Sequence, residues 1–217
     1  MSDIFREVDE EVRRDKALEF WAKYQNHMIA FAVLVVAASG GYRFYENRQR
    51  AAAEAAGARY EAALQLAREN KAQDADAAFQ DIIRQGLPGY ALLARFRAAA
   101  EFAATDRPKA VAIYDGLASD AAVDPLMQDL AKLRAALLRV DEADAAELKA
   151  RLEPLAGAGQ PFRNSARELL AFAALKASDF EAAGRWFDAI VVDSQAPQAL
   201  RQRAEALAGL VAAGKTN

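Results

Sequence analysis

Side chains that commonly carry catalysis or bind metals are scarce in this sequence. It contains no cysteine and one histidine, His27, so common zinc sites and Cys-His or Ser-His catalysis lack their parts. No glycine-rich phosphate-binding motif is present. Two carboxylate pairs, at 74 and 76 and at 141 and 142, are conceivable acid–base groups, but we interpret them as solvated charges. We therefore expect no enzyme activity, no catalytic or metal-binding residue, no cofactor and no small-molecule substrate.

Basic side chains recur at matched positions relative to prolines. Arg95 and Lys132 each lie seven residues after a proline. Arg97 and Arg134 follow the same two prolines by nine residues. Such residues could form a basic strip that binds acidic groups of a partner, or they could pair with acidic neighbours and only support the fold, because exposed pairs contribute about 0–1 kcal/mol each. The candidate partner-binding residues are Arg95, Arg97, Lys132, Arg134 and Arg167.

The elements that would position these side chains follow a repeat. Four prolines are separated by 37, 36 and 36 residues. Proline suits the first turn of a helix, because its missing N–H has no intrahelical partner to lose. A second apolar-faced segment follows halfway through each period, and no segment is typical of a strand. The prolines are Pro88, Pro125, Pro161 and Pro197, and the expected hairpins cover 54–85, 88–120, 125–156 and 161–193, followed by a lone helix over 197–213.

Each second helix carries one packing pattern. A large apolar residue has an alanine or leucine four positions earlier and an apolar residue three positions later, so the three share one helix face. The pattern resembles the A-x-x-x-F element of tetratricopeptide repeats, although the usual first-helix signature is degenerate here. A generic alanine-rich bundle is the alternative. The central residues are Phe79, Tyr114, Leu152 and Phe187, preceded by Ala75, Ala110, Leu148 and Ala183 and followed by Ile82, Leu117, Leu155 and Ile190.

Charge divides between the two sets of helices. The first-helix segments carry ten basic and four acidic residues, whereas the second-helix segments carry seven basic and fifteen acidic residues. In a tetratricopeptide solenoid the first helices line the concave surface, so the resemblance implies a basic inner strip. The whole chain has a net charge of −3 and a pI near 5.4, which gives no electrostatic reason to expect a nucleic-acid partner.

Nineteen residues, 24–42, contain no charged side chain. About 20 apolar residues in a helix cross the hydrocarbon layer of a bilayer, so we expect a transmembrane helix over 24–45. Aromatic and basic residues at its ends suit the headgroup boundary. A cleavable signal peptide and a buried soluble helix are the alternatives. The expected membrane-anchoring residues are Trp21, Tyr24, Tyr42 and Arg43.

The remaining segments complete the expected domain plan. Residues 1–23 form an amphipathic tail, in which Ile4, Val8 and Val12 share one side of a helix. A helical stalk with the first repeat helix covers 46–70, and Gly57 within it is interpreted as a tolerated flaw or slight bend. The repeat domain covers 71–217 and ends in a capping helix. The expected fold is therefore all-α: one transmembrane helix followed by a tetratricopeptide-like α-solenoid of helical hairpins.

The whole pattern resembles one family in particular. A short DIFREVDEEVRRDK leader, one span, an alanine-rich stalk and the segments GYALLARFRAAAEF, LAKLRAALL and PFRNSARELLAFAALK are similar to the YfgM-type ancillary subunit of the bacterial Sec translocon. One departure lies in the last hairpin, where Ser178-Asp179 stands at the turn and the family's Leu-Gly-Asp element is missing. The resemblance implies a cytoplasmic N-terminus, a periplasmic repeat domain and association with the translocon, exported clients or chaperones.

These patterns predict a non-enzymatic scaffold in the bacterial inner membrane that binds proteins. It would be an ancillary translocon subunit or a chaperone-like factor for exported proteins. Charge bias around the span does not decide the orientation, because four basic residues precede it and three follow it closely. The alternatives are a soluble periplasmic repeat protein that coordinates envelope assembly or cell division, and a regulatory subunit of an envelope enzyme.

Overall fold

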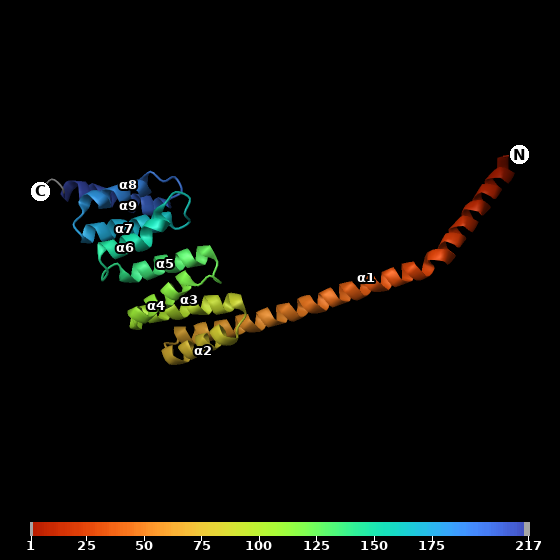
Figure 1. The fold of residues 1–217 in the computed structure, drawn as a ribbon, viewed down its shortest axis with the longest axis horizontal. Coiled ribbons are helices and arrows are strands. Elements are labelled where there is room, and N and C mark those ends of the chain that lie inside the picture. The colour runs from red at the N-terminus through yellow and green to blue at the C-terminus, as the bar shows by residue number, and fades with distance from the viewer. Residues whose placement is uncertain (1, 215–217) are drawn as a thin grey trace. The chain divides into compact units, whose positions relative to one another are not determined.

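The protein is all-α over the residues that the structure describes. The computed structural model describes the backbone of residues 2–214 and the side chains of 13–16 and 18–212, and residues 2–214 contain no strand. This confirms the all-α part of the expected fold. Figure 1 shows the helices in chain order: α1 (Ser2–Arg68), α2 (Ala72–Gln85), α3 (Pro88–Thr105), α4 (Arg107–Ser119), α5 (Pro125–Arg139), α6 (Ala145–Ala156), α7 (Arg163–Lys176), α8 (Phe180–Val191) and α9 (Gln198–Gly214).

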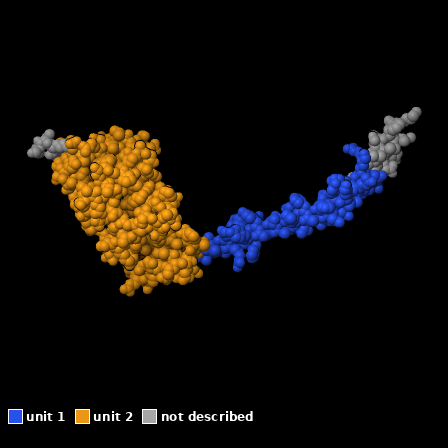
Figure 2. All heavy atoms as spheres, viewed as in Figure 1, with its two compact units in different colours: residues 1–55 blue, residues 56–217 orange. Residues whose placement is uncertain are grey.

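The chain divides into two compact units, residues 1–55 and 56–217 (Figure 2). The first unit consists of the N-terminal part of α1, and nearly all of its described side chains are exposed. The expected shared side of Ile4, Val8 and Val12 lies outside the described side chains. The second unit contains the end of α1 and all the later helices.

Helices in the second unit form four hairpins and a closing helix. Each second helix, namely α2, α4, α6 or α8, packs against the first helix of its own hairpin and against the helix that follows it. Four hydrophobic clusters result, each built around one second helix. Such nearest-neighbour stacking is the architecture of helical repeats, in which no hairpin buries its apolar face alone.

The packing pattern read from the sequence fills these clusters. Every central residue, every residue four positions earlier and every residue three positions later is buried, with exposed fractions of 0–5%. The alanines of the first helices at Ala94, Ala131 and Ala166 are fully buried as well. Small alanines allow the helix backbones to approach closely, and the large residues fill the space between them. The repeat prediction is therefore confirmed at its packing positions.

The prolines do not all occupy the same place in their helices. Pro88 and Pro125 are the first residues of α3 and α5, as expected. Pro161 and Pro197 instead precede α7 and α9, so the expected position is wrong for these two. The carbonyl group of Pro197 accepts hydrogen bonds from the next helix at 3.0 Å, which makes it a capping residue.

Aspartates begin three of the four second helices. Asp106, Asp144 and Asp179 accept hydrogen bonds from backbone N–H groups three residues later, at 3.1, 2.7 and 2.9 Å. A side-chain oxygen at this position satisfies an N–H group that has no partner within the helix, and a negative charge suits the helix N-terminus. Part of the acidic surplus of the second helices is therefore required by helix capping.

The last hairpin turns through Ser178, which has a φ of 60°. The N–H of the next residue, Asp179, donates to the carbonyl of Ala174 at 2.8 Å and closes the end of α7. Glycine adopts this left-handed conformation most easily. Ser178 thus occupies a turn position that favours glycine, beside the aspartate that caps α8.

Candidate protein-binding site

Two of the five candidate basic residues hold hairpins of the repeat domain together. Arg95 on α3 donates to Asp120 at the end of α4, with 2.7 Å between Nη1 and Oδ2. Arg167 on α7 donates to Asp193 at 3.0 Å and to two backbone carbonyl groups at 3.0 and 3.1 Å. The side chain of Arg167 is only 13% exposed. These side chains are engaged in the fold, so we do not include them in the binding surface proposed below.

Asp193, the carboxylate bound by Arg167, also accepts hydrogen bonds from a second arginine. Arg163 donates to both of its carboxylate oxygens, at 2.6 and 2.9 Å. This hydrogen bonding, together with the backbone N–H of Gln195, lowers the pKa of Asp193 far below its usual value. At Asp120, the hydrogen bond from Arg95 likewise lowers the pKa of the carboxyl group. Both carboxylates are therefore charged at neutral pH.

Two further candidates pair with acidic residues on their own helices. Arg97 contacts Glu101 on α3, and Lys132 lies 2.8 Å from Asp129 on α5. The four side chains are 22–41% exposed. Pairs this accessible contribute about 0–1 kcal/mol, so a partner carboxylate can replace the intramolecular one at little cost. The Nε of Arg97 is buried and has no hydrogen-bond partner among the described residues.

Arg134 differs from the other four. It is exposed on α5, and no described carboxylate lies within 4.0 Å of its guanidinium group. Burial raises the pKa of the Tyr114 hydroxyl on α4, and the positive charges of Arg134 and Arg97 act to lower it.

Exposed leucines lie on the same two first helices. Leu93, Leu126 and Leu137 are 45%, 47% and 46% exposed. Leu126 and Leu137 share one side of α5 with Arg134, because residues separated by three, four, seven or eight positions lie on one helix face. We define the first-helix face as Leu93, Arg97, Leu126, Arg134 and Leu137.

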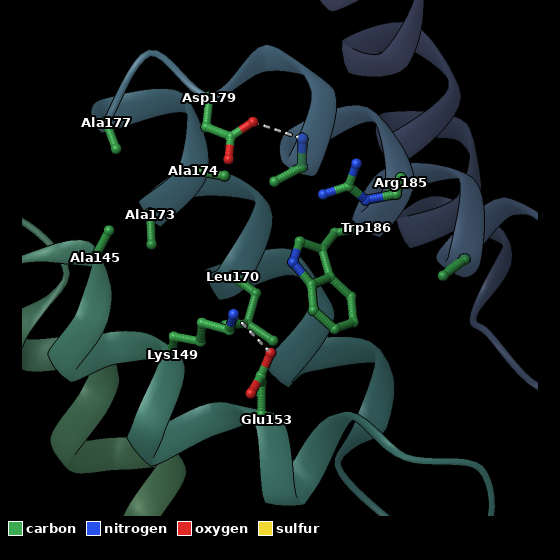
Figure 3. Close-up of a pocket in the computed structure, with 12 residues that line it drawn as sticks. Ala145, Lys149, Glu153, Leu170, Ala173, Ala174, Ala177, Asp179, Arg185 and Trp186 are labelled. Carbon is green, nitrogen blue, oxygen red and sulfur yellow. Dashed lines mark hydrogen bonds and ion pairs between the residues drawn. The ribbon is translucent and has the colours of Figure 1, made fainter.

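A groove of about 470 Å³ lies among α6, α7 and α8 (Figure 3). Its floor is apolar, with Leu170, Ala173 and Ala174 contributed by α7. Glu153 of α6 and Trp186 of α8 lie on facing sides of it. We call it the α6–α8 groove. No group of three or more His, Asp or Glu side chains within the described part of the chain is placed to hold a metal ion.

Most of the chain matches one known protein family. The tetratricopeptide repeat-like domain family matches residues 18–183. The chain belongs to this family. No curated protein and no solved structure is significantly similar to it.

Membership of the tetratricopeptide repeat-like family suggests a protein-interaction scaffold. The match begins before the uncharged stretch and ends within α8, so it includes the apolar part of α1 and the hairpins that carry the first-helix face. Family membership thus suggests protein partners.

The four expected membrane-anchoring residues all lie exposed on α1. Trp21, Tyr24 and Tyr42 are 51%, 39% and 68% exposed, and Arg43 is exposed as well. Within the described residues, α1 is the one helix whose apolar stretch is long enough to cross a membrane, and none of that stretch is buried. Length and composition make it a candidate span.

Sequence reasoning missed two features of this repeat-like domain. Asp120 and Asp193 each lie 32 residues after a repeat proline, the same kind of signal that singled out Arg95, the partner of Asp120. The α6–α8 groove was missed because only the packing residues of the second helices were aligned. The residue before the central one is Arg151 in α6 and Trp186 in α8, and that difference was visible in the sequence.

Proposed function

We propose that this protein is a non-enzymatic scaffold, held at a membrane by α1, that binds protein partners through the first-helix face. The observation that carries the membrane part is the exposure of the uncharged stretch. Phe31, Leu34 and Val36 are 69%, 64% and 71% exposed, although they lie within 19 residues that carry no charge. A helix that exposes apolar side chains around its surface is stable in lipid, where burying them stabilises by about 25 cal/mol per Å².

The binding part rests on the composition of the first-helix face. Interfaces between proteins combine apolar anchors with arginine, and a basic face selects acidic partners. Leu93, Leu126 and Leu137 supply the apolar surface, and Arg97 and Arg134 supply the charge. The expected occupant is therefore a polypeptide segment that carries both acidic and apolar side chains.

The cellular setting is the finer part of the proposal and rests on the YfgM-type resemblance. In it, the N-terminus is cytoplasmic, the repeat domain is periplasmic, and the membrane is the bacterial inner membrane. The partners are translocon components, exported clients or periplasmic chaperones. Exported chains that are still unfolded expose apolar residues, which suits a face that presents leucines.

Protease treatment of spheroplasts tests the membrane part. Protease added from outside is expected to digest the repeat domain and to leave a protected fragment of about 45 residues, close to the length needed for the tail and one span. A mature protein that begins near Gly40 would instead indicate a cleaved signal peptide and would contradict the proposal.

In-cell crosslinking tests the binding part. A photoreactive amino acid at Leu126 is expected to capture translocon subunits or exported proteins, and the same group at Arg84 on α2, 67% exposed, serves as the control. Equal capture from both positions would contradict a specific role for the first-helix face.

A further inference from the structure

Successive second helices are joined differently along the stack. At the junction of α4 and α6, Arg151 donates two hydrogen bonds to Asp115, with distances of 2.7 and 3.2 Å. Asp115 directly follows the central residue of α4, and Arg151 directly precedes the central residue of α6. A bidentate pair of this kind is among the stronger hydrogen-bonded contacts in proteins. An arginine of the chain itself thus closes this junction.

The junction of α6 and α8 lacks that arginine. Glu153 directly follows the central residue of α6, as Asp115 does in α4, so the acidic partner is present. Trp186 takes the place of the arginine in α8. The two side chains face one another across the α6–α8 groove (Figure 3). The chain therefore supplies the carboxylate of such a pair at this junction, but no arginine at the facing position of α8.

A neighbouring position on the second helices shows a similar change. Lys109, five residues before the central residue of α4, places its ammonium group 3.6 Å from the centre of the Phe102 ring. The corresponding residue of α8 is Ala182, which lines the groove. The chain thus supplies a cation at this position of α4, whereas α8 carries an uncharged alanine there.

The charges around the groove leave Glu153 available. Lys149 lies 3.5 Å from Glu153, farther than the 2.7 Å of the contact in the α4–α6 junction, and both side chains are about half exposed or more. Arg185 pairs with Glu181 at the edge of α8. Asp179 is engaged in capping α8. A cation from outside can therefore displace the amine of Lys149 at little cost.

We propose that the α6–α8 groove is a second protein-binding site, which receives an arginine or lysine side chain from a segment of a partner protein. The guanidinium or ammonium group would bond to Glu153 and lie against the ring of Trp186, the aromatic side chain that attracts cations most strongly. Aliphatic residues beside it would cover Leu170, Ala173 and Ala174 on the floor. The groove would select a basic segment, whereas the first-helix face would select an acidic one. One scaffold can therefore hold both kinds of segment at separate places.

A peptide titration on the full-length protein in nanodiscs tests this site. The probe is an acetylated and amidated helical peptide of alanine and leucine with one central arginine and an uncharged fluorophore, and binding is read as fluorescence anisotropy. Its matched control carries citrulline, which keeps the shape of arginine without the charge. We expect saturable binding of the arginine peptide and about tenfold weaker binding of the citrulline peptide, the loss typical of a missing charge-assisted hydrogen bond.

Variants of the protein separate this site from the first-helix face. Glu153→Gln should weaken the arginine peptide about tenfold, and Trp186→Arg should abolish binding by supplying the missing arginine from within. The double variant Arg97→Glu/Arg134→Glu should leave this affinity unchanged, so failure here is distinguishable from failure of the proposed function. Equal affinity for the arginine and citrulline peptides, no effect of Glu153→Gln, or no saturable binding would overturn the proposal. If Trp186→Arg does not fold, as judged by circular dichroism, Glu153→Gln decides the outcome.

Discussion

The hydroxyl group of Tyr90 on α3 lies directly against Gly57 on α1. A Cβ atom added at residue 57 would be 2.8 Å from this oxygen, closer than real Cβ contacts, and 3.5 Å from the ring carbon that carries it. The Tyr90 ring also packs against that of Tyr60 in a tilted arrangement, at a centroid distance of 6.0 Å. Gly57 on α1 therefore leaves room for the Tyr90 hydroxyl of α3.

A double-mutant cycle tests this contact. Gly57→Ala alone should change stability little, because a gain of about 1 kcal/mol in helix propensity is offset by the displaced tyrosine. In the Tyr90→Phe background the oxygen is absent, so the same substitution should stabilise by about 1 kcal/mol. Denaturant unfolding followed by circular dichroism measures all four proteins. Identical effects of Gly57→Ala in both backgrounds would show that the hydroxyl does not occupy this space.

Phe187 is the fully buried centre of the last hairpin. Phe187→Ala should destabilise the repeat domain by about 3–5 kcal/mol, because it removes a buried ring and leaves a cavity. Phe180→Ala in the same helix removes a side chain that is 40% exposed and should cost clearly less. Thermal melts of the two variants provide the comparison, and equal losses would contradict the packing described here.

The low pKa of Asp193 predicts how stability depends on pH. Since the pKa is lower in the folded state than in the unfolded state, the carboxylate stabilises the fold above its unfolded pKa of about 3.9 and loses this contribution as pH falls below that value. Asp193→Asn should therefore lower the melting temperature at pH 7, and the difference from wild type should shrink between pH 4 and pH 2. Melts across this range measure it.

The matched control for Asp193 is Asp188→Asn, which changes an exposed aspartate on α8, five residues earlier. Its effect on the melting temperature should be small at every pH, as is usual for a solvated charge. If the effect of Asp193→Asn on the melting temperature were the same at pH 7 and pH 2, the negative charge of Asp193 beside Arg163 would not be what stabilises the fold.

Charge reversal on the first-helix face should weaken partner capture. Arg97→Glu combined with Arg134→Glu is expected to reduce crosslinking in cells while leaving helicity unchanged, because both side chains are accessible and their contacts are weak. Arg84→Glu combined with Arg107→Glu makes the same change in charge on the second helices α2 and α4 and should have little effect. Association through the first-helix face should also weaken as salt rises. Comparable losses from both double variants would mean that net charge, and no particular face, governs capture.

Sequence reasoning succeeded where one helix face decides the outcome. The spacing around Phe79, Tyr114, Leu152 and Phe187 predicted buried positions, since helix geometry fixes which residues share a face. It could not separate the roles of Arg95 and Lys132. The two residues hold matched positions in the chain, but Arg95 bonds to another helix, and this difference depends on where Asp120 lies in space. The counts of acidic and basic residues were also ambiguous, because capping aspartates such as Asp144 serve the backbone and not a partner.

Each hydrophobic cluster is completed by the helix that follows a hairpin, never by a distant part of the chain. Folding can therefore proceed in the order of synthesis, since every contact needed by one hairpin becomes available within the next few tens of residues. A chain that emerges gradually from a ribosome or a channel would leave no more than about one hairpin waiting for its cover at any time. The α9 helix is the last to arrive, and until it does, α8 is covered by α7 alone and the apolar residues that pack on α9 stay exposed to proteases and aggregation.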